Sequence, residues 1–266
     1  MSPVEKQPKG PEQEPIVHWG FHNLQLRVKE IYEEHDRECG YGPDTILVKL
    51  LGNTEILKKI IRKDPANIEA FDKAITNIFI WTGTIANEGR IVLLNVISEK
   101  YAYGCPRCGQ MPCLLTHGKP CEDTGNFLGT VPEKMPYTIG EWQEHLSRIY
   151  PNNFAQGVQE ALKLTSDRLL DEVSELISST HPDVERELSQ FSVYRNREDS
   201  TFPWKGEFAD VLAWALGVSE VLNRLTGNYS VEKSLMEKYK DGCPFCKKPL
   251  CACPRERTII EDLKKF

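Results

Sequence analysis

The chain has 266 residues, 40% of them hydrophobic, and a formal net charge of −6. This length and composition suffice for two ordinary domain cores. The acidic balance weighs against a nucleic-acid partner. No apolar run reaches ~18 residues, so we expect no transmembrane helix and no membrane partner.

The first segment, residues 1–15, is polar and contains Pro3, Pro8, Pro11 and Pro15. Such a composition predicts a disordered tail. The segment has no apolar core of the kind found in secretory signals. We therefore expect a cytoplasmic protein, in which paired cysteines bind metals more often than they form disulfides.

The remainder of the chain contains an internal repeat. The sequence Glu99-Lys100-Tyr101, followed by a Gly-Cys-Pro-x-Cys motif, returns 138 positions later as Glu237-Lys238-Tyr239 with the same motif. Near the start of each half the shift is 118, which places Gln25 on Gln143 and Tyr32 on Tyr150. Matches at a constant shift indicate a tandem duplication. The difference of 20 residues predicts an insertion in the second copy, within the connector 178–206.

The repeat divides the chain into an N-terminal copy at 16–122, a linker at 123–136 and a C-terminal copy at 137–266. Each copy has the pattern of a helix, a helix with a connector, a long buried helix, a short helix and a cysteine knuckle. The segment 92–97 is rich in β-branched residues, but its alignment with 231–236 favours a helix. The predicted fold class is all-α, and residues 255–266 are expected to add a short helix.

The first copy carries Glu69-x-x-Asp72 in the long helix, whereas the preceding helix retains a single acid, Glu55. The acids Glu30 and Glu33 fall on the first helix and are predicted to form a solvated face. We expect this copy to lack a full metal cluster. Whether Glu69 and Asp72 hold a weakly bound ion stays open.

The chain has nine cysteines, and eight of them form two sets. The first set is Cys105, Cys108 and Cys113, with either Cys121 or His117 as the fourth member. The second set is Cys243, Cys246, Cys251 and Cys253. A Cys-x-x-Cys knuckle suits a tetrahedral zinc ion, so about two Zn²⁺ per chain are expected, with iron–sulfur clusters as the alternative. The ninth, Cys39, is expected to be a small buried hydrophobe.

Two pairs of acids mark the second copy, Glu172-x-x-Glu175 and Glu207-x-x-Asp210. Spacing of i,i+3 places both members of a pair on one helix face. The second pair starts an almost wholly apolar segment, 208–218, which is typical of a buried helix. If the two helices pack together, four carboxylates converge and need compensating cations. Oxygen ligands of this kind favour Mg²⁺ or Mn²⁺.

The order of these pairs, with Leu-Leu-Asp before the first and Val-Leu after the second, resembles the MazG-like nucleotide pyrophosphohydrolases. The resemblance covers about residues 139–240. It implies that Glu172, Glu175, Glu207 and Asp210 bind Mg²⁺, and that the substrate is a nucleoside triphosphate split into monophosphate and pyrophosphate. The fold would be a tandem repeat of MazG-like helical bundle units, each ending in a zinc knuckle. Members of the family pair their copies, so the tandem repeat could supply that pair within one chain, and a homodimer also stays open.

A polyphosphate substrate also needs positive partners. The basic residues near the acids are Lys163, Arg168, Lys205 and Arg224. Trp204, beside Lys205, could stack on a base or simply cover the bundle end. The expected chemistry is in-line attack by a metal-activated water between the α and β phosphates, with Glu172 or Glu175 as candidate general base. The alternative function is a non-catalytic, zinc-binding interaction or regulatory module on a degenerate bundle.

Overall fold

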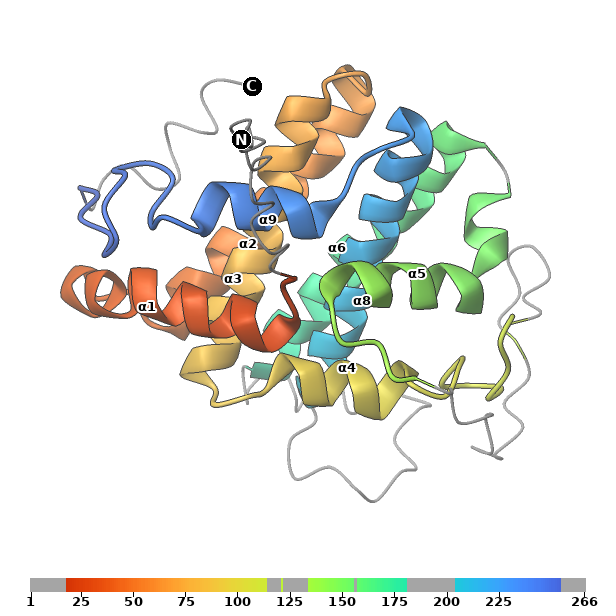
Figure 1. Ribbon diagram of the computed structural model, residues 1–266, viewed down its shortest axis with the longest axis horizontal. Helices are drawn as coiled ribbons and strands as arrows, with labels where there is room; N and C mark the ends of the chain where they lie inside the picture. The colour runs from red at the N-terminus through yellow and green to blue at the C-terminus, as the bar shows by residue number, and fades with distance from the viewer. Residues whose placement is uncertain (1–17, 114–120, 122–133, 156, 181–203, 255–266) are drawn as a thin grey trace, which may run out of the picture.

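The computed structural model describes residues 18–113, 121, 134–155, 157–180 and 204–254 (Figure 1). Within these ranges the chain forms eight α-helices, one 3₁₀ helix and no strand, which confirms the all-α class. The N-terminal half contributes α1 (Phe21–Cys39), α2 (Pro43–Lys63), α3 (Ile68–Glu88) and α4 (Leu93–Tyr101). The C-terminal half contributes α5 (Ile139–Ile149), η1 (Pro151–Phe154), α6 (Val158–Thr180), α8 (Trp204–Thr226) and α9 (Val231–Tyr239).

Several sequence predictions fall outside the described residues. They are the N-terminal tail at 1–15, the helix expected at 255–266, His117, most of the linker 123–136 and most of the connector 178–206.

Local signals explain where the helices begin and end. Pro43 opens α2 at the position where a proline costs no hydrogen bond. The Asn67 side chain accepts a hydrogen bond from the Ala70 amide at the start of α3. Thr138 and Glu141 form a reciprocal capping box at the start of α5. Gly40 ends α1 in the left-handed conformation, with φ of 66°.

The short helices α4 and α9 correspond at the shift of 138 seen in the sequence. Each has nine residues, and both end in the repeated Glu-Lys-Tyr sequence. The β-branched segment 92–97 therefore lies mostly within a helix, as its alignment predicts. The long helices α3 and α8 also correspond, with 21 and 23 residues.

The long helices α2, α3, α6 and α8 form a four-helix bundle (Figure 1). Helix α2 packs against α3 and α6, and α8 packs against α6 and α3, so both halves meet within the bundle. The first helix of each half packs on its own long helix, α1 on α3 and α5 on α8. The short helices are exchanged: α4 packs on α8 of the other half, and α9 packs on α3.

The two halves share one hydrophobic core. Phe21, Phe71 and Phe79 from the first half are fully buried in it, as are Trp142 and Phe208 from the second. Burying these rings is a large part of the favourable free energy of folding. No helix among the described residues has the length and apolar character needed to cross a membrane.

Candidate active site and metal centres

The predicted acids on α6 and α8 converge. Glu172 and Glu175 lie one turn apart on α6, and Glu207 lies in the first turn of α8, which packs beside α6. One carboxylate oxygen from each of these three residues lies within 4.8 Å of the other two. The helix dipole at the start of α8 favours the negative charge of Glu207. The prediction that the two pairs meet is correct for these three acids.

The fourth acid, Asp210, has protein partners of its own. Its carboxylate accepts hydrogen bonds from the Lys100 ammonium and from the Tyr101 hydroxyl, both at the end of α4. Lys100 also donates to the Gly206 carbonyl oxygen at 3.4 Å. Asp210 is therefore not in the three-carboxylate group, although it lies one turn from Glu207. This differs from the expected equal set of four ligands.

Sequence reasoning did not assign Lys100 and Tyr101 to the site. They belong to the N-terminal half, and they reach the acids because α4 packs on α8. The available signal was the recurrence of Glu-Lys-Tyr in both halves. That recurrence indicates the repeat, but it does not by itself give the lysine and the tyrosine a structural role.

The three converging carboxylates have raised pKa values. Burial, followed by the charges of Asp210, Glu175 and Glu207, raises the pKa of Glu172 to about 8. Burial and Asp210 raise the pKa of Glu207 to about 7, and the same two causes raise the pKa of Glu175. The Lys100 charge lowers all three pKa values but does not cancel the increase. The repulsion among these carboxylates is therefore relieved when the cluster binds either protons or a cation.

The donor set suits a hard divalent cation. Only carboxylate oxygens converge, and such ligands are preferred by Mg²⁺ and Mn²⁺ over softer metals. Glu175 is exposed and Glu172 and Glu207 are half-buried, so the site is open to solvent on one side. That opening leaves room for waters or phosphate oxygens to complete the coordination of Mg²⁺.

The basic residues proposed from sequence occupy different places. Arg168 lies 3.6 Å from Asp171 and lowers the pKa of Glu175, so it is near the acids. Lys205 is exposed at the start of α8, and the Trp204 side chain lies outside the described part of the structure. Lys163 lines a separate hollow between α2 and α6. Arg224 bonds Glu220 at 2.8 Å near the far end of α8, away from the acids.

The corresponding position in the N-terminal half is closed by hydrogen bonds. The Asp72 carboxylate accepts hydrogen bonds from the Tyr229 and Ser234 hydroxyls, and Lys238 lies 2.6 Å from it. Glu69 is exposed, and Glu55 is exposed in the hollow between α2 and α6. Among the described residues, no group of three potential ligands includes these acids.

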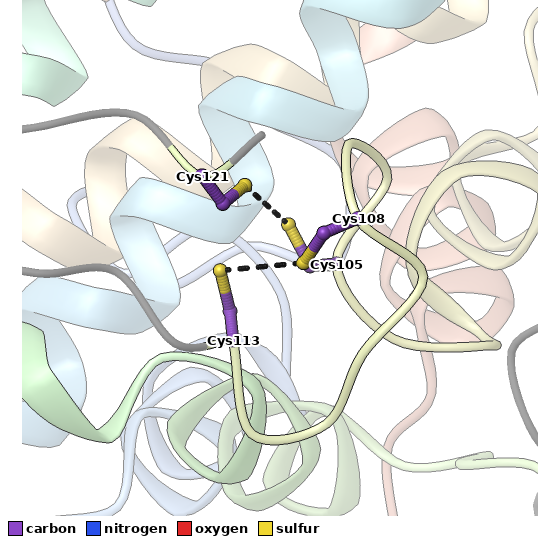
Figure 2. A group of neighbouring side chains, drawn as sticks. All are labelled: Cys105, Cys108, Cys113 and Cys121. Atoms are coloured by element: carbon purple, nitrogen blue, oxygen red, sulfur yellow. Dashed lines mark hydrogen bonds between the residues drawn. The ribbon is translucent and has the colours of Figure 1, made fainter. Parts of the chain in front are cut away.

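Both cysteine sets form compact groups of four sulfurs. Cys105, Cys108, Cys113 and Cys121 converge so that their sulfur atoms lie within 4.8 Å of one another (Figure 2). Cys243, Cys246, Cys251 and Cys253 do the same. None of these eight described cysteines forms a disulfide. Cys121 therefore supplies the fourth sulfur of the first group, while His117 lies outside the described residues.

The sulfur separations match a single tetrahedral ion. The Cys105–Cys121 and Cys108–Cys113 pairs are 3.7 Å apart, and the Cys243–Cys253 pair is 3.8 Å apart. Four Zn–S bonds of ~2.3 Å in a tetrahedron place the sulfurs ~3.8 Å from each other. Either group could hold zinc with no coordination position left open.

One thiol in each group is poised to ionise. A hydrogen bond from Cys251, aided by backbone amides, overcomes burial and lowers the pKa of Cys243 to about 4. Burial alone would raise the pKa of Cys105, but the amides of Cys108 and Arg107 lower it to about 7. A thiolate that is already stabilised in the fold makes metal binding less costly.

Each cysteine group is bound to the first helix of the other half. The Cys113 amide donates to the Ile149 carbonyl oxygen at 2.7 Å, and the Cys251 amide donates to the Ile31 carbonyl oxygen at 2.8 Å. The Tyr32 hydroxyl donates to the Cys243 sulfur at 3.8 Å. Its counterpart Tyr150 hydrogen-bonds Cys105. The two knuckles are thus exchanged between the halves in the same way as α4 and α9.

The chain matches no family model, no curated protein and no solved structure. The resemblance to the MazG-like enzymes therefore stays a prediction carried by the sequence pattern alone.

Two smaller predictions are confirmed. Cys39 is buried, and its sulfur lies 3.6 Å from the His35 ring. Glu30 and Glu33 are exposed and pair with Arg27 and Lys29 on the same helix.

Proposed function

We propose that the chain is a Mg²⁺-dependent nucleoside triphosphate pyrophosphohydrolase with one active site, in its C-terminal half. The observation that carries this proposal is the convergence of Glu172, Glu175 and Glu207, with raised pKa values and Asp210 one turn away. Carboxylates grouped near the surface can bind a divalent cation that also coordinates the oxygens of a polyphosphate. The family resemblance supplies the reaction class.

The residues of the site have distinct proposed roles. Glu172, Glu175 and Glu207 would hold Mg²⁺, and Asp210, restrained by Lys100 and Tyr101, would complete the negative field. Bound Mg²⁺ supplies charge neutralisation on the phosphate oxygens and lowers the pKa of a coordinated water. Glu172 or Glu175 would accept the proton of the water that attacks the α-phosphorus. The α–β bridging oxygen leaves with pyrophosphate, and the water oxygen stays on the nucleoside monophosphate.

The two cysteine groups are proposed to be structural zinc sites, one in each half. Their closed four-thiolate composition supports this role, because catalytic zinc sites keep a position open for water or substrate. We further propose that the halves descend from a tandem duplication. The equal shifts in sequence, the matching α4 and α9, and the reciprocal knuckle contacts all support an internal pseudo-dimer.

The test is pyrophosphate release from a panel of ribo- and deoxyribonucleoside triphosphates, with and without Mg²⁺. Glu172→Gln should lower the rate by at least about 100-fold, since it removes a ligand or base from the site. Glu160→Gln, an exposed glutamate slightly more than three turns earlier on α6, is the matched control and should keep wild-type activity. Absence of Mg²⁺-dependent turnover in a folded, zinc-loaded protein would favour the non-catalytic interaction module.

A further inference from the structure

A large hollow lies between α2 and α6, away from the candidate active site. Its volume is about 760 Å³, and it is lined by the late turns of α2 and the early turns of α6. Because these ends meet, the two helices run antiparallel in the bundle (Figure 1). A hollow of this size can hold a small ligand. We call it the α2–α6 hollow.

The α2–α6 hollow is separate from the carboxylate cluster. Lys163, which lines the hollow, and Glu172, which belongs to the cluster, are nine residues apart on α6. Nine residues are two and a half helical turns, so the two side chains leave α6 on opposite sides, ~14 Å apart along its axis. A ligand in the hollow is therefore independent of a cation bound by the carboxylates.

One ion pair fixes how the two walls of the hollow are aligned. The Lys58 ammonium on α2 lies 2.9 Å from the Asp167 carboxylate on α6. Arg62 follows Lys58 by four residues, and Lys163 precedes Asp167 by four. Because the helices are antiparallel, both steps lead ~6 Å in the same direction along the hollow, and the spacing of four keeps each side chain on the same helix face. Arg62 and Lys163 therefore lie at the same level on opposite walls.

Three cations of the hollow have no carboxylate partner in the described part of the chain. Lys59, Arg62 and Lys163 line the hollow, and within that part none of them forms an ion pair. Lys59 is half-buried, whereas Arg62 and Lys163 are exposed to solvent. Like charges that face one another across a hollow repel, and a bound anion relieves that repulsion. The arrangement is the counterpart, in the opposite sign, of the carboxylate cluster.

Two acids in the lining act against an anion. Apart from the ion pair, the described lining carries three cations and the acids Glu55 and Glu160. Glu55 is seven residues from Arg62 on α2, which is ~10 Å along the axis. Glu160 is closer, because it precedes Lys163 by only three residues on α6. The positive charge is thus concentrated at the level of Arg62 and Lys163, and Glu160 weakens it there.

We propose that the α2–α6 hollow binds a chain of phosphates without the help of a metal ion. The Arg62 guanidinium would hold two phosphate oxygens with its planar fork, and Lys59 and Lys163 would act as point charges. Lys59 and Arg62 are ~4.5 Å apart along α2, with Lys163 on the opposite wall, so the three cations suit several linked phosphates better than one. A free polyphosphate and the tail of a nucleoside triphosphate share this chemistry. The site is additional to the proposed hydrolase and does not depend on it.

The experiment is titration calorimetry of the full-length, zinc-loaded protein with inorganic tripolyphosphate in Mg²⁺-free buffer. Without Mg²⁺ the carboxylate cluster repels an anion, so the binding measured reports on the hollow. One site with a Kd below about 1 mM is expected at low salt, and it should weaken as salt is added. Adenosine triphosphate is titrated in parallel. Equal affinity of the two ligands would identify the phosphate chain alone as the ligand, and tighter binding of adenosine triphosphate would identify a nucleotide.

Variants of both charge signs test the residues. Arg62→Gln and Lys163→Gln should each weaken tripolyphosphate binding about 5- to 10-fold, because each removes a charged donor to phosphate. Glu160→Gln should strengthen it about two- to threefold, because it removes a repelling charge. Lys29→Gln removes an exposed lysine from α1 and is the matched control, which should bind as the wild type does. All four side chains are exposed, and circular dichroism and zinc content check that each variant is folded.

The result that overturns the proposal is equally specific. Absence of saturable tripolyphosphate binding at low salt would show that the hollow is an ordinary solvated surface. Equal losses of affinity in Arg62→Gln and Lys29→Gln would show that the anion is attracted by surface charge in general and has no site between α2 and α6. Neither result bears on the hydrolase, since the titration needs no Mg²⁺ and no turnover.

Discussion

The decisive residue of the acidic site is one that carries the opposite charge. Lys100 reaches from the N-terminal half to Asp210 and lowers the pKa values of Glu172, Glu175 and Glu207. Its ammonium group offsets part of the electrostatic repulsion among the four carboxylates of the partly buried site. The same charge also opposes any divalent cation that binds there. Lys100 therefore stabilises the metal-free fold and weakens metal binding.

This dual role predicts the behaviour of Lys100→Gln. Mg²⁺ affinity should rise roughly 10-fold, because a neighbouring positive charge is removed. The metal-free protein should lose about 1–3 kcal/mol of stability, since Asp210 loses its ion-pair partner. Titration calorimetry with Mg²⁺ and urea unfolding measure the two effects.

The chain provides a matched control in Lys238→Gln. Lys238 makes the equivalent ion pair with Asp72, at 2.6 Å, in the closed position of the first half. This variant should also lose stability but should bind Mg²⁺ as the wild type does. Unchanged Mg²⁺ affinity in Lys100→Gln would contradict the role given to that lysine.

The raised carboxylate pKa values predict an unusual pH dependence. The pKa of Glu172 is raised from 4.5 to about 8 and that of Glu207 to about 7, so between pH ~4.5 and ~8 the folded state binds more protons than the unfolded state. Stability of the Mg²⁺-free protein should therefore fall as pH rises through this range, and the loss is complete above the folded pKa values. Urea unfolding of zinc-loaded protein at pH 5, 6, 7 and 8 measures the slope.

Glu172→Gln should flatten this slope, because the variant has no proton to release there. Saturating Mg²⁺ should do the same by stabilising the ionised carboxylates. A wild-type stability that rises between pH 5 and 8 without Mg²⁺ would rule out the electrostatic description of the site.

At the scale of elements, helix type and helix face were predictable, but helix partners were not. The apolar segment 208–218 predicts the buried part of α8, and the repeat correctly predicts helix at the β-branched segment 92–97. The i,i+3 spacing is enough to bring Glu172, Glu175 and Glu207 together once α6 and α8 are neighbours. The packing of α4 on α8 and of α9 on α3 depends on contacts between distant segments, which periodicity within one helix does not encode. Lys100 and Tyr101 were missed for that reason.

The knuckles offer a prediction at the same scale. Cys105→Ser should lower activity more than Cys243→Ser, although both variants should lose one zinc. The first knuckle contacts Tyr150, whose ring packs on Tyr101 and hence on the partner of Asp210. The second knuckle contacts Tyr32 in the half without the carboxylate cluster.

Elemental analysis and pyrophosphate release measure this difference. We expect two zinc ions per wild-type chain and one in each variant, with a loss of roughly 2 kcal/mol or more in stability. Iron in place of zinc would contradict the assignment of these two groups as zinc sites. Equal activity in the two variants would show that the first knuckle does not support the site.

For the whole molecule, the shared core makes each half dependent on the other. The bundle joins α2 to α6 and α3 to α8, and buried rings from both halves lie in one cluster. A half alone would expose that apolar surface to water, which costs ~25 cal/mol per Å². Folding should therefore be a single cooperative transition.

Separate expression of residues 16–122 and 137–266 tests this dependence. Each fragment alone should give poorly dispersed NMR spectra, and mixing them with zinc should restore a folded complex with Mg²⁺ binding. A folded, Mg²⁺-binding C-terminal fragment by itself would contradict the need for α4 at the site.

Because α4 packs on the other half, it also affects which positions of the first half can tolerate mutation. The acids of the site lie between residues 172 and 210, but their restraining partners are encoded at 100 and 101. Variation in the first half should therefore be tolerated at Glu69, whose side chain is exposed, and penalised at Lys100 and Tyr101. A saturation mutagenesis screen for activity should find its most sensitive N-terminal positions there and in the first knuckle. Selection on the site would thus preserve Lys100 and Tyr101 in the half whose described residues do not form the carboxylate cluster.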